Sequence, residues 1–274
     1  MIQFRTPDLT VFQSALFCTT STVIQTEDIV LVIDPNWLPH EVANICQFVD
    51  GIKKNRPVVL LFTHSDYDHI IGWKAFADAQ VIASQAFVDN KEQEKILAEI
   101  RTFDDEYYIT RAYDIAYPTV DFPIQKEGQV LHFGDTKITF YHATGHNADG
   151  IFAIINDQYW IAGDYFCEVE FPYIYHSSYE YEQTLSKTTP ILSSHRPQFL
   201  IPGHGTVATS ATEILKRKEN ALNYIHQLRD SIKTGKHFDL DNLWKQYKFP
   251  QIMTKFHLAN VTLMKKEENL LNNR

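Results

Sequence analysis

Residues 58–73 read VVLLFTHSDYDHIIGW, a run of apolar and β-branched residues that ends in two histidines and two aspartates. The apolar part is typical of a strand that a sheet buries on both faces. The polar residues after it are His64, Asp66, Asp68 and His69. Burying such groups without partners costs free energy. We interpret them as metal ligands, since imidazole nitrogens and carboxylate oxygens suit zinc, iron and manganese. The alternative is that Asp66 or Asp68 caps a helix that begins near His69.

Metal-type side chains also follow three later strand-like segments. They are His142 and His146 in YHATGHNADG, Asp164 in WIAGDYF and His204 in FLIPGHG. Glycines flank these positions, so the backbone can turn tightly and approach a neighbour closely. Strand ends that face the same side of a sheet hold their loops on a rigid scaffold, which is where functional sites form. We therefore expect these residues to converge with the first cluster.

The bulk composition is that of an ordinary globular protein. The chain has 274 residues, of which 44% are hydrophobic and 22% charged, and its formal net charge is −9. Single domains usually reach ~250 residues before they divide, and no Pro/Gly/Ser-rich linker is visible, so we expect a single domain over residues 1–274. The negative charge argues against nucleic acid or an anionic membrane as a partner, because phosphate groups bind clustered Lys and Arg.

The sequence also favours a cytoplasmic protein. Its three cysteines, Cys18, Cys46 and Cys167, have no CxxC spacing and do not form the pattern of a disulfide framework. The N-terminus lacks the basic start and apolar core of a signal peptide. No uncharged apolar run approaches the ~18 residues of a membrane span.

Periodicity gives a coarse secondary structure. Strand signals lie at residues 9–18, 21–26, 28–35, 57–63, 79–84, 129–133, 137–143, 151–156 and 158–163. Apolar residues at helical spacing predict a helix over residues 38–54, and the charged segment 85–101 is also expected to be helical.

Two segments depart from this alternation of strands and helices. Residues 102–128 are rich in tyrosine and acid, and we interpret them as an ordered insertion or lid, because disordered chains contain few aromatic residues. Residues 209–274 carry apolar positions three or four apart, which predicts a helical C-terminal extension.

The motifs together resemble a known family. THSDYDHIIG at residues 63–72 is similar to the THxHxDHxGG signature of the metallo-β-lactamase superfamily. GH at 145–146, GD at 163–164 and PGHG at 202–205 follow in that family's order, and the resemblance covers about residues 9–208. It implies an α/β (α+β) fold: a four-layer αβ/βα sandwich of two mixed β-sheets with helices outside and a dinuclear metal site at one edge.

The resemblance also implies a set of ligands. His64, Asp66 and His146 would hold the first metal, Asp68, His69 and His204 the second, and Asp164 would bridge the two. The cofactors would be two divalent metal ions, zinc first, with manganese or iron as alternatives. One position departs from the family pattern, because Asp66 stands where the signature has histidine. An added carboxylate should shift the preference toward manganese or iron.

Three further polar residues are candidates for support of the site or contact with substrate. Asp34 ends a predicted strand, where it either supports a metal ligand by a hydrogen bond or starts a turn. His142 lies on a strand four residues before His146, and we expect it in the core or packed behind a ligand. His176 lies beyond Asp164 in a region that shapes the pocket of relatives, and contact with substrate or a surface role are equally compatible with the sequence.

We predict a metal-dependent hydrolase on these grounds. Two cations would turn water into a bridging hydroxide near neutral pH, and Asp68 would be the catalytic residue that orients it or receives its proton. No G-x-S-x-G segment supplies a serine nucleophile instead. Tyrosine-rich segments suggest a partly apolar pocket for a small-molecule substrate, first an ester, lactone or thioester.

Other functions stay open at this level. A small-molecule phosphodiesterase of the same fold is the second choice, and a nuclease is disfavoured by the acidic charge. An iron-dependent sulfur dioxygenase is a redox alternative, and a non-catalytic binding protein is a third. The oligomeric state and the substrate itself are not encoded in any of these motifs.

Overall fold

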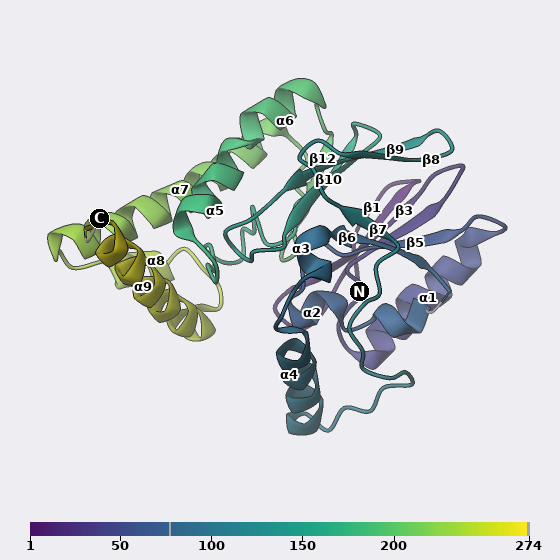
Figure 1. The fold of residues 1–274 in the computed structure, drawn as a ribbon, viewed down its shortest axis with the longest axis horizontal. Helices are drawn as coiled ribbons and strands as arrows, with labels where there is room; N and C mark the ends of the chain where they lie inside the picture. Colours follow the sequence, from purple (N-terminus) through teal and green to yellow (C-terminus); the bar gives the residue numbers. More distant parts are fainter. Residues whose placement is uncertain (77, 273–274) are drawn as a thin grey trace.

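Two β-sheets face each other in the computed structural model, which describes residues 1–76 and 78–272, and helices cover both outer faces (Figure 1). The first sheet has its seven strands in chain order. Its strands are β1 Ile2–Arg5, β2 Leu9–Gln13, β3 Thr20–Gln25, β4 Val30–Ile33, β5 Val58–Leu61, β6 Gln80–Ser84 and β7 Phe122–Ile124. Strands β1 to β4 pair antiparallel and β4 to β7 parallel, so the sheet is mixed.

The second sheet has five strands in the order β12-β11-β10-β9-β8. They are β8 Val130–Phe133, β9 Thr136–His142, β10 Ile151–Ile155, β11 Tyr159–Ile161 and β12 Phe199–Ile201. Only β11 and β12 pair parallel, and the other pairs are antiparallel.

The helices of the first half cover the first sheet. They are α1 Pro39–Lys53, α2 Tyr67–Ile70, the 3₁₀ helix Trp73–Phe76, α3 Gln85–Val88 and α4 Gln93–Glu106. Helix α1 begins with a proline, which lacks the N–H that the first turn leaves unpaired. The Glu41 carboxylate accepts a hydrogen bond from the backbone N–H of Leu38, so it caps the helix start.

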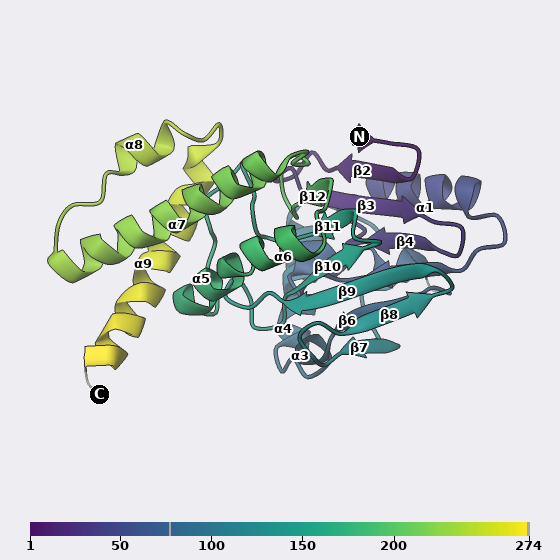
Figure 2. The same ribbon diagram turned by 90° about the horizontal axis from the view of Figure 1, so that it is seen from above.

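The helices of the second half cover the other sheet and extend beyond it. They are α5 Ser178–Ser186, α6 Thr188–Ser194, α7 Ala211–Thr234, α8 Leu240–Trp244 and α9 Pro250–Asn272. Ser210 caps α7 by accepting from the backbone N–H of Glu213. Gly235 ends the helix with a φ of +69°, a conformation that favours glycine. Figure 2 shows α7, α8 and α9 projecting from one end of the sheets.

Three apolar clusters bind these layers together, and they confirm the predicted sandwich. One lies between the sheets and joins Leu61 and Ile82 of the first sheet to Phe140 and Ile155 of the second. Another packs the other face of the first sheet against α1, α3 and α4. The last packs the second sheet against α5 to α9.

Several predicted boundaries were wrong. The strand predicted over 9–18 ends at Gln13, because Phe17 and Cys18 take positive φ values of 52° and 53° in a turn. The helix predicted over 85–101 is two helices, α3 and α4, separated around Asn90.

The predicted insertion over residues 102–128 is shorter than expected. Helix α4 continues to Glu106, and residues 122–124 form β7 at the edge of the first sheet. The remaining loop is tied to the fold, because the Trp73 indole donates to the carbonyl of Ala116 and the Tyr117 hydroxyl donates to the carbonyl of Phe87. A lid function for this loop stays a prediction.

The C-terminal extension is helical, as predicted. None of the described helices combines the length and the apolar character that crossing a bilayer requires. The division of residues 1–274 into one domain with a core over 9–208 remains a prediction from sequence.

Candidate metal centre

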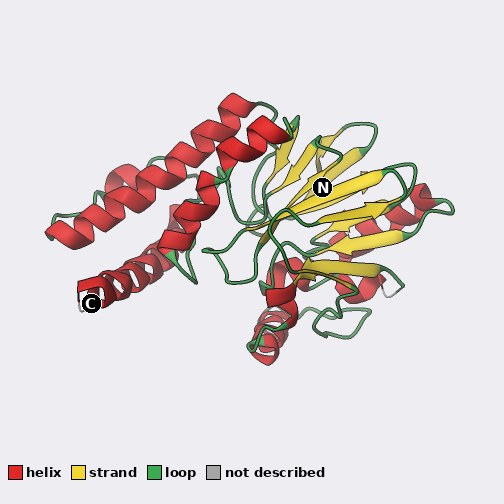
Figure 3. Ribbon diagram, turned by 45° about the horizontal axis from the view of Figure 1, so that its top comes forward, coloured by secondary structure: helices red, strands yellow, loops and turns green. Residues whose placement is uncertain are grey.

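Loops from both sheets meet at the strand ends that face the C-terminal helices (Figure 3). His64 follows β5 by three residues, and α2 carries Asp68 and His69, with Asp66 directly before it. The other side chains come from the second sheet. His146 follows β9, Asp164 follows β11 and His204 follows β12. The structure therefore brings all seven predicted ligands to one edge.

Asp164 lies at the middle of this cluster. Its carboxylate oxygens are 3.8 Å from Nε2 of His64 and 3.4 Å from Nε2 of His146. They are also 3.2 Å from Nε2 of His69 and 3.3 Å from Nε2 of His204. One carboxylate thus contacts four imidazoles, as a bridging ligand would.

The remaining two aspartates divide the imidazoles into two groups. Asp66 Oδ2 is 3.6 Å from Nε2 of His64 and 3.1 Å from Nε2 of His146. Asp68 Oδ2 is 3.6 Å from Nε2 of His69 and 3.7 Å from Nε2 of His204. We name these the first cluster (His64, Asp66, His146) and the second cluster (Asp68, His69, His204), with Asp164 between them.

Each imidazole is oriented by a contact at its other nitrogen. Nδ1 of His64 is 2.9 Å from the Thr63 hydroxyl, and Nδ1 of His69 is 3.0 Å from Asp34 Oδ2. Nδ1 of His146 is 2.7 Å from the carbonyl oxygen of Tyr173, and Nδ1 of His204 is 2.9 Å from that of Phe17. Such contacts leave Nε2 available, which is the arrangement that metal-binding histidines use.

Several nitrogen and oxygen atoms at the centre of the cluster lack a hydrogen-bond partner and are spaced as the ligands of a metal ion would be. Nε2 of His64, Nε2 of His69 and Oδ1 of Asp164 are buried and have no hydrogen-bond partner among the described residues. Buried polar atoms are normally hydrogen-bonded, so these require another partner. Two ligands about 2.0–2.1 Å from a tetrahedral ion lie about 3.4 Å apart, which matches the spacings above. The residues therefore fit divalent cations.

The electrostatics of the cluster also favour bound positive charge. Burial disfavours the charged form of His146, but the carboxylates of Asp164 and Asp66 outweigh it and raise its pKa to about 9. Burial likewise opposes the charge on His204, and Asp164 and Glu170 raise its pKa to about 10. The carboxylates thus create a site that stabilises cations.

Gly203 shows how closely the backbone approaches the cluster. A Cβ at this position would lie 2.1 Å from Asp164 Oδ1 and 2.9 Å from Cε1 of His69. Glycine is therefore the residue that allows β12 to bring His204 alongside the other candidate ligands.

A comparison of the sequence with models of protein families identifies the family of this chain. The model of the metallo-beta-lactamase superfamily matches residues 17–220, about three quarters of the chain. The chain belongs to the metallo-β-lactamase superfamily. A comparison with curated proteins finds no significant match.

Solved structures share this metallo-β-lactamase fold at low sequence identity. A metallo-beta-lactamase family protein from Thermus thermophilus is 14% identical, with a TM-score of 0.64 and coverage of 96% of this chain and 95% of that one. A superfamily protein from Sulfolobus tokodaii is 15% identical, with a TM-score of 0.57 and coverage of 96% and 98%. Rubredoxin oxygen:oxidoreductase from Desulfovibrio gigas is 13% identical, with a TM-score of 0.52 and coverage of 83% and 62%. These likenesses establish the fold.

The three supporting candidates have different positions in this superfamily site. Asp34 lies against the candidate ligand His69, and its φ of 47° shows that the chain also turns there. His142 differs from the prediction, because its side chain is 39% exposed and its Nδ1 is 3.7 Å from Glu127. It is the last residue of β9 at the surface, where Glu127 offers an ion pair, so it is neither in the core nor behind a ligand.

His176 lies beside the site through its backbone. Its N–H donates to the carbonyl of His146, while its ring lies 3.3 Å from Glu180. Contact with substrate stays a prediction for this residue.

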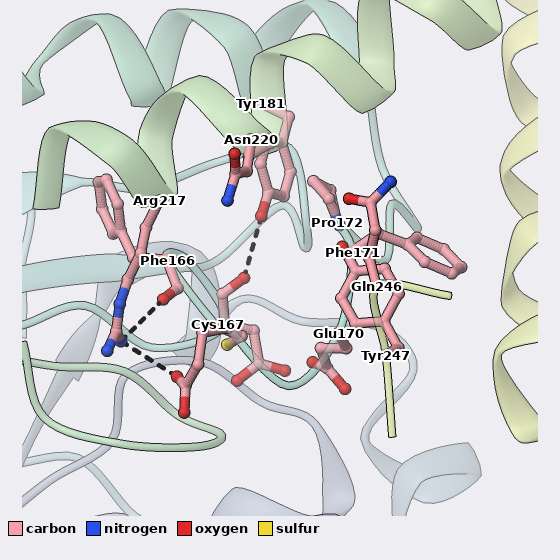
Figure 4. Close-up of a pocket in the computed structure, with 13 residues that line it drawn as sticks. Phe166, Cys167, Glu170, Phe171, Pro172, Tyr181, Arg217, Asn220, Gln246 and Tyr247 are labelled. Carbon is pink, nitrogen blue, oxygen red and sulfur yellow. Dashed lines mark hydrogen bonds and ion pairs between the residues drawn. The ribbon is translucent and has the colours of Figure 1, made fainter. Parts of the chain in front are cut away.

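Two polar residues near the cluster of candidate ligands were not predicted from the sequence. Asn147 donates from Nδ2 to Asp66 Oδ1, and its position next to His146 was the signal that could have identified it. Glu170 offers a carboxylate oxygen within 4.8 Å of ligand atoms of Asp164 and His204, and burial raises its pKa to about 7. Figure 4 shows Glu170 beside Tyr247. These two residues and Asp164 line a small cavity of about 90 Å³. Glu170 belongs to none of the sequence motifs, so no signal in the sequence could have identified it.

Proposed function

We propose that this protein is a hydrolase that uses two divalent cations to cleave a small ester, lactone or thioester. The observation that carries the proposal is the convergence of four Nε2 atoms on Asp164, each imidazole being held at Nδ1 by the protein. The first cluster would hold one cation, the second cluster the other, and Asp164 would contact both. Zinc is the first candidate, with manganese and iron as alternatives, because the ligands combine imidazole and carboxylate.

Cations bound there would supply Lewis acidity and lower the pKa of water. The chain contributes the positioning. Asp68 is buried, and its Oδ2 lies 3.6 Å from Nε2 of His69 and 3.7 Å from Nε2 of His204. Its carboxylate would accept a proton from the attacking water. Asp34 and the carbonyls of Tyr173 and Phe17 keep the imidazoles in place during this transfer.

Aromatic side chains beside the first cluster support a small organic substrate. The ring of Tyr175 lies 5.0 Å from that of His146, and Tyr175 is 47% exposed. Phe256 on α9 lies 6.5 Å from Tyr175. Such rings provide flat apolar contact area together with one hydroxyl group. The proposed partner is therefore a small molecule rather than nucleic acid, in agreement with the net charge of −9.

The experiment pairs metal analysis with a substrate panel. Elemental analysis of the purified protein should give two divalent metals per chain, and the loaded protein should hydrolyse at least one of a set of nitrophenyl esters, lactones and thioesters. His69→Ala should reduce the metal content below two per chain and remove most of the hydrolysis. A loaded protein that cleaves bis-nitrophenyl phosphate and none of these acyl substrates would replace the proposed substrate class by phosphodiesters.

A second candidate function is iron-dependent oxidation, including that of sulfur compounds. Asp66 favours it, because an added carboxylate suits iron better than a histidine does. The oxidoreductase from Desulfovibrio gigas also shares the fold. One iron per chain together with thiol-dependent oxygen uptake would support this candidate, and two zinc ions without oxygen uptake would exclude it.

The three cysteines support a cytoplasmic location. All are unpaired in the described structure, and free thiols persist in a reducing compartment.

A further inference from the structure

His146 depends on a loop for its orientation. It lies outside the strands and helices, and its Nδ1 is 2.7 Å from the carbonyl oxygen of Tyr173. Tyr173 also belongs to no helix or strand. The direction in which Nε2 points therefore depends on what fixes the backbone at residue 173.

Asn260 on α9 holds the backbone on both sides of Tyr173. Its Oδ1 accepts from the backbone N–H of Ile174 at 3.0 Å, and its Nδ2 donates to the carbonyl of Pro172 at 2.7 Å. The same Nδ2 donates to the Tyr224 hydroxyl on α7 at 3.0 Å. Asn260 is only 1% exposed, so water does not compete for these hydrogen bonds.

Other contacts from α9 hold the same loop. The ring of Phe256, one helical turn before Asn260, stacks on the ring of Tyr173 with centroids 4.0 Å apart and planes 17° apart. Farther along α9, Glu267 accepts from the backbone N–H of Ser178 at 2.9 Å. Helix α9 therefore holds this loop at residues 172–174 and again at Ser178, where α5 begins.

We propose that Asn260 is a positioning residue of the metal centre, which acts through the Tyr173 carbonyl on His146. This inference rests on the proposed function, because it takes His146 to be a metal ligand. Residue 260 lies beyond residues 17–220, the part that matches the family model, so the C-terminal extension contributes to the metal centre as well as to the core. Residues that orient a ligand in this way typically change metal affinity 10- to 100-fold when they are replaced, so we expect about 10-fold here.

The test is Asn260→Leu, which keeps the approximate size of the side chain and removes its hydrogen bonds. Zinc is titrated into the metal-free protein against a chromophoric chelator, and the affinities of the two clusters are assigned with His146→Ala and His204→Ala. We expect the first cluster to bind zinc about 10-fold more weakly and the second to stay within about 2-fold of the wild type. Tyr224→Phe is the matched control, because it removes the other partner of the Asn260 amide without touching residues 172–174. It should leave both affinities within about 2-fold.

The possible results separate the inference from the proposed function. A wild type that binds none of zinc, manganese and iron would remove the proposed function, and the inference with it. A wild type with two zinc sites and an Asn260→Leu variant with unchanged affinities would overturn the inference alone. Equal weakening of both clusters, shared by Tyr224→Phe and accompanied by equal losses of melting temperature, would show a structural role only and also overturn it.

If Asn260→Leu does not fold, a second variant tests the same inference. Phe256→Leu removes the stacking on Tyr173 from a side chain that is only partly buried. It should weaken the first cluster selectively by about 3-fold or more, below the full effect expected of Asn260. Unchanged affinity of the first cluster in this variant would then overturn the inference.

Discussion

Oδ2 of Asp34 lies 3.0 Å from Nδ1 of His69, so a residue at the end of β4 orients a side chain on α2. The other oxygen of the same carboxylate accepts from the backbone N–H of Thr63 at 2.9 Å, and Oδ2 also accepts from the Thr63 hydroxyl at 2.6 Å. Both His69 and Asp34 are buried. This one carboxylate therefore joins two neighbouring strand ends to a residue of the second cluster.

Replacing Asp34 should weaken metal binding without removing a ligand. Asp34→Ala leaves the imidazole of His69 free to rotate, and we expect the second cluster to bind zinc about 10- to 100-fold more weakly. The first cluster should weaken less, because Asp34 reaches His64 only through the Thr63 hydroxyl, and a chelator competition titration measures the two clusters. Wild-type affinity at both clusters in Asp34→Ala would contradict the role assigned to this carboxylate.

Loss of a ligand should remove metal and activity together. His69→Ala and Asp164→Asn should each lower hydrolysis by more than about 100-fold, the upper range for residues that merely support a ligand. Elemental analysis of the same samples should show less than two metals per chain. His142→Ala is the matched control, since this histidine is exposed and pairs with Glu127 instead. Full activity in either ligand variant would reject the two-cation mechanism.

Replacing Asp66 with histidine, the residue of the family signature, should change the preference between zinc and manganese. Asp66 presents a hard carboxylate oxygen to the first cluster, 3.1 Å from Nε2 of His146. Asp66→His replaces it with imidazole, which should raise the affinity for zinc relative to manganese by about 10-fold. Parallel titrations of both proteins with the two metals measure this ratio. An unchanged ratio of zinc to manganese affinity would show that Asp66 does not set the metal preference of the first cluster.

Glu41 gives a test of the scaffold that is independent of the metal. Burial raises the pKa of its carboxyl, but hydrogen bonds from the backbone of Leu38 and Ala15 and from the Ser14 hydroxyl outweigh this and lower it. A carboxyl whose folded-state pKa is depressed stabilises the protein above its unfolded pKa of about 4.3, and the stabilisation is lost as pH falls through the folded value. Glu41→Gln should therefore cost about 1 kcal/mol at pH 7.

Chemical denaturation of both proteins at several pH values measures this effect. The difference in the free energy of unfolding should shrink below about pH 4. Zinc affinity should be unaffected, because Glu41 lies outside both clusters. A difference that grows as the pH falls would have the wrong sign.

The sequence could predict which candidate ligands come together, because metal-type side chains follow several strands within the motifs of the family signature. Of the groups that orient them, the sequence offered Asp34 in one of two possible roles, and this carboxylate does contact His69. The sequence could not predict the backbone carbonyls of Tyr173 and Phe17, which contact His146 and His204 and have no side-chain signature of their own. Such partners become visible only when the chain is folded.

The errors in secondary structure have similar causes. The break between α3 and α4 falls near Asn90, whose Nδ2 donates to the Ser65 hydroxyl at 2.9 Å, a contact between distant parts of the chain. Strand β7 has only three residues and contains Pro123, which an edge strand tolerates but which weakens any strand signal in the sequence. Tertiary contacts and edge positions therefore account for what periodicity missed.

Anomalous diffraction at the zinc absorption edge tests the central claim most directly. Crystals grown with zinc should show two anomalous peaks, one contacting His64, Asp66 and His146 and the other contacting Asp68, His69 and His204. Asp164 should contact both peaks. No peak among these residues, or a single peak held by other side chains, would contradict the dinuclear site on which the proposed function rests.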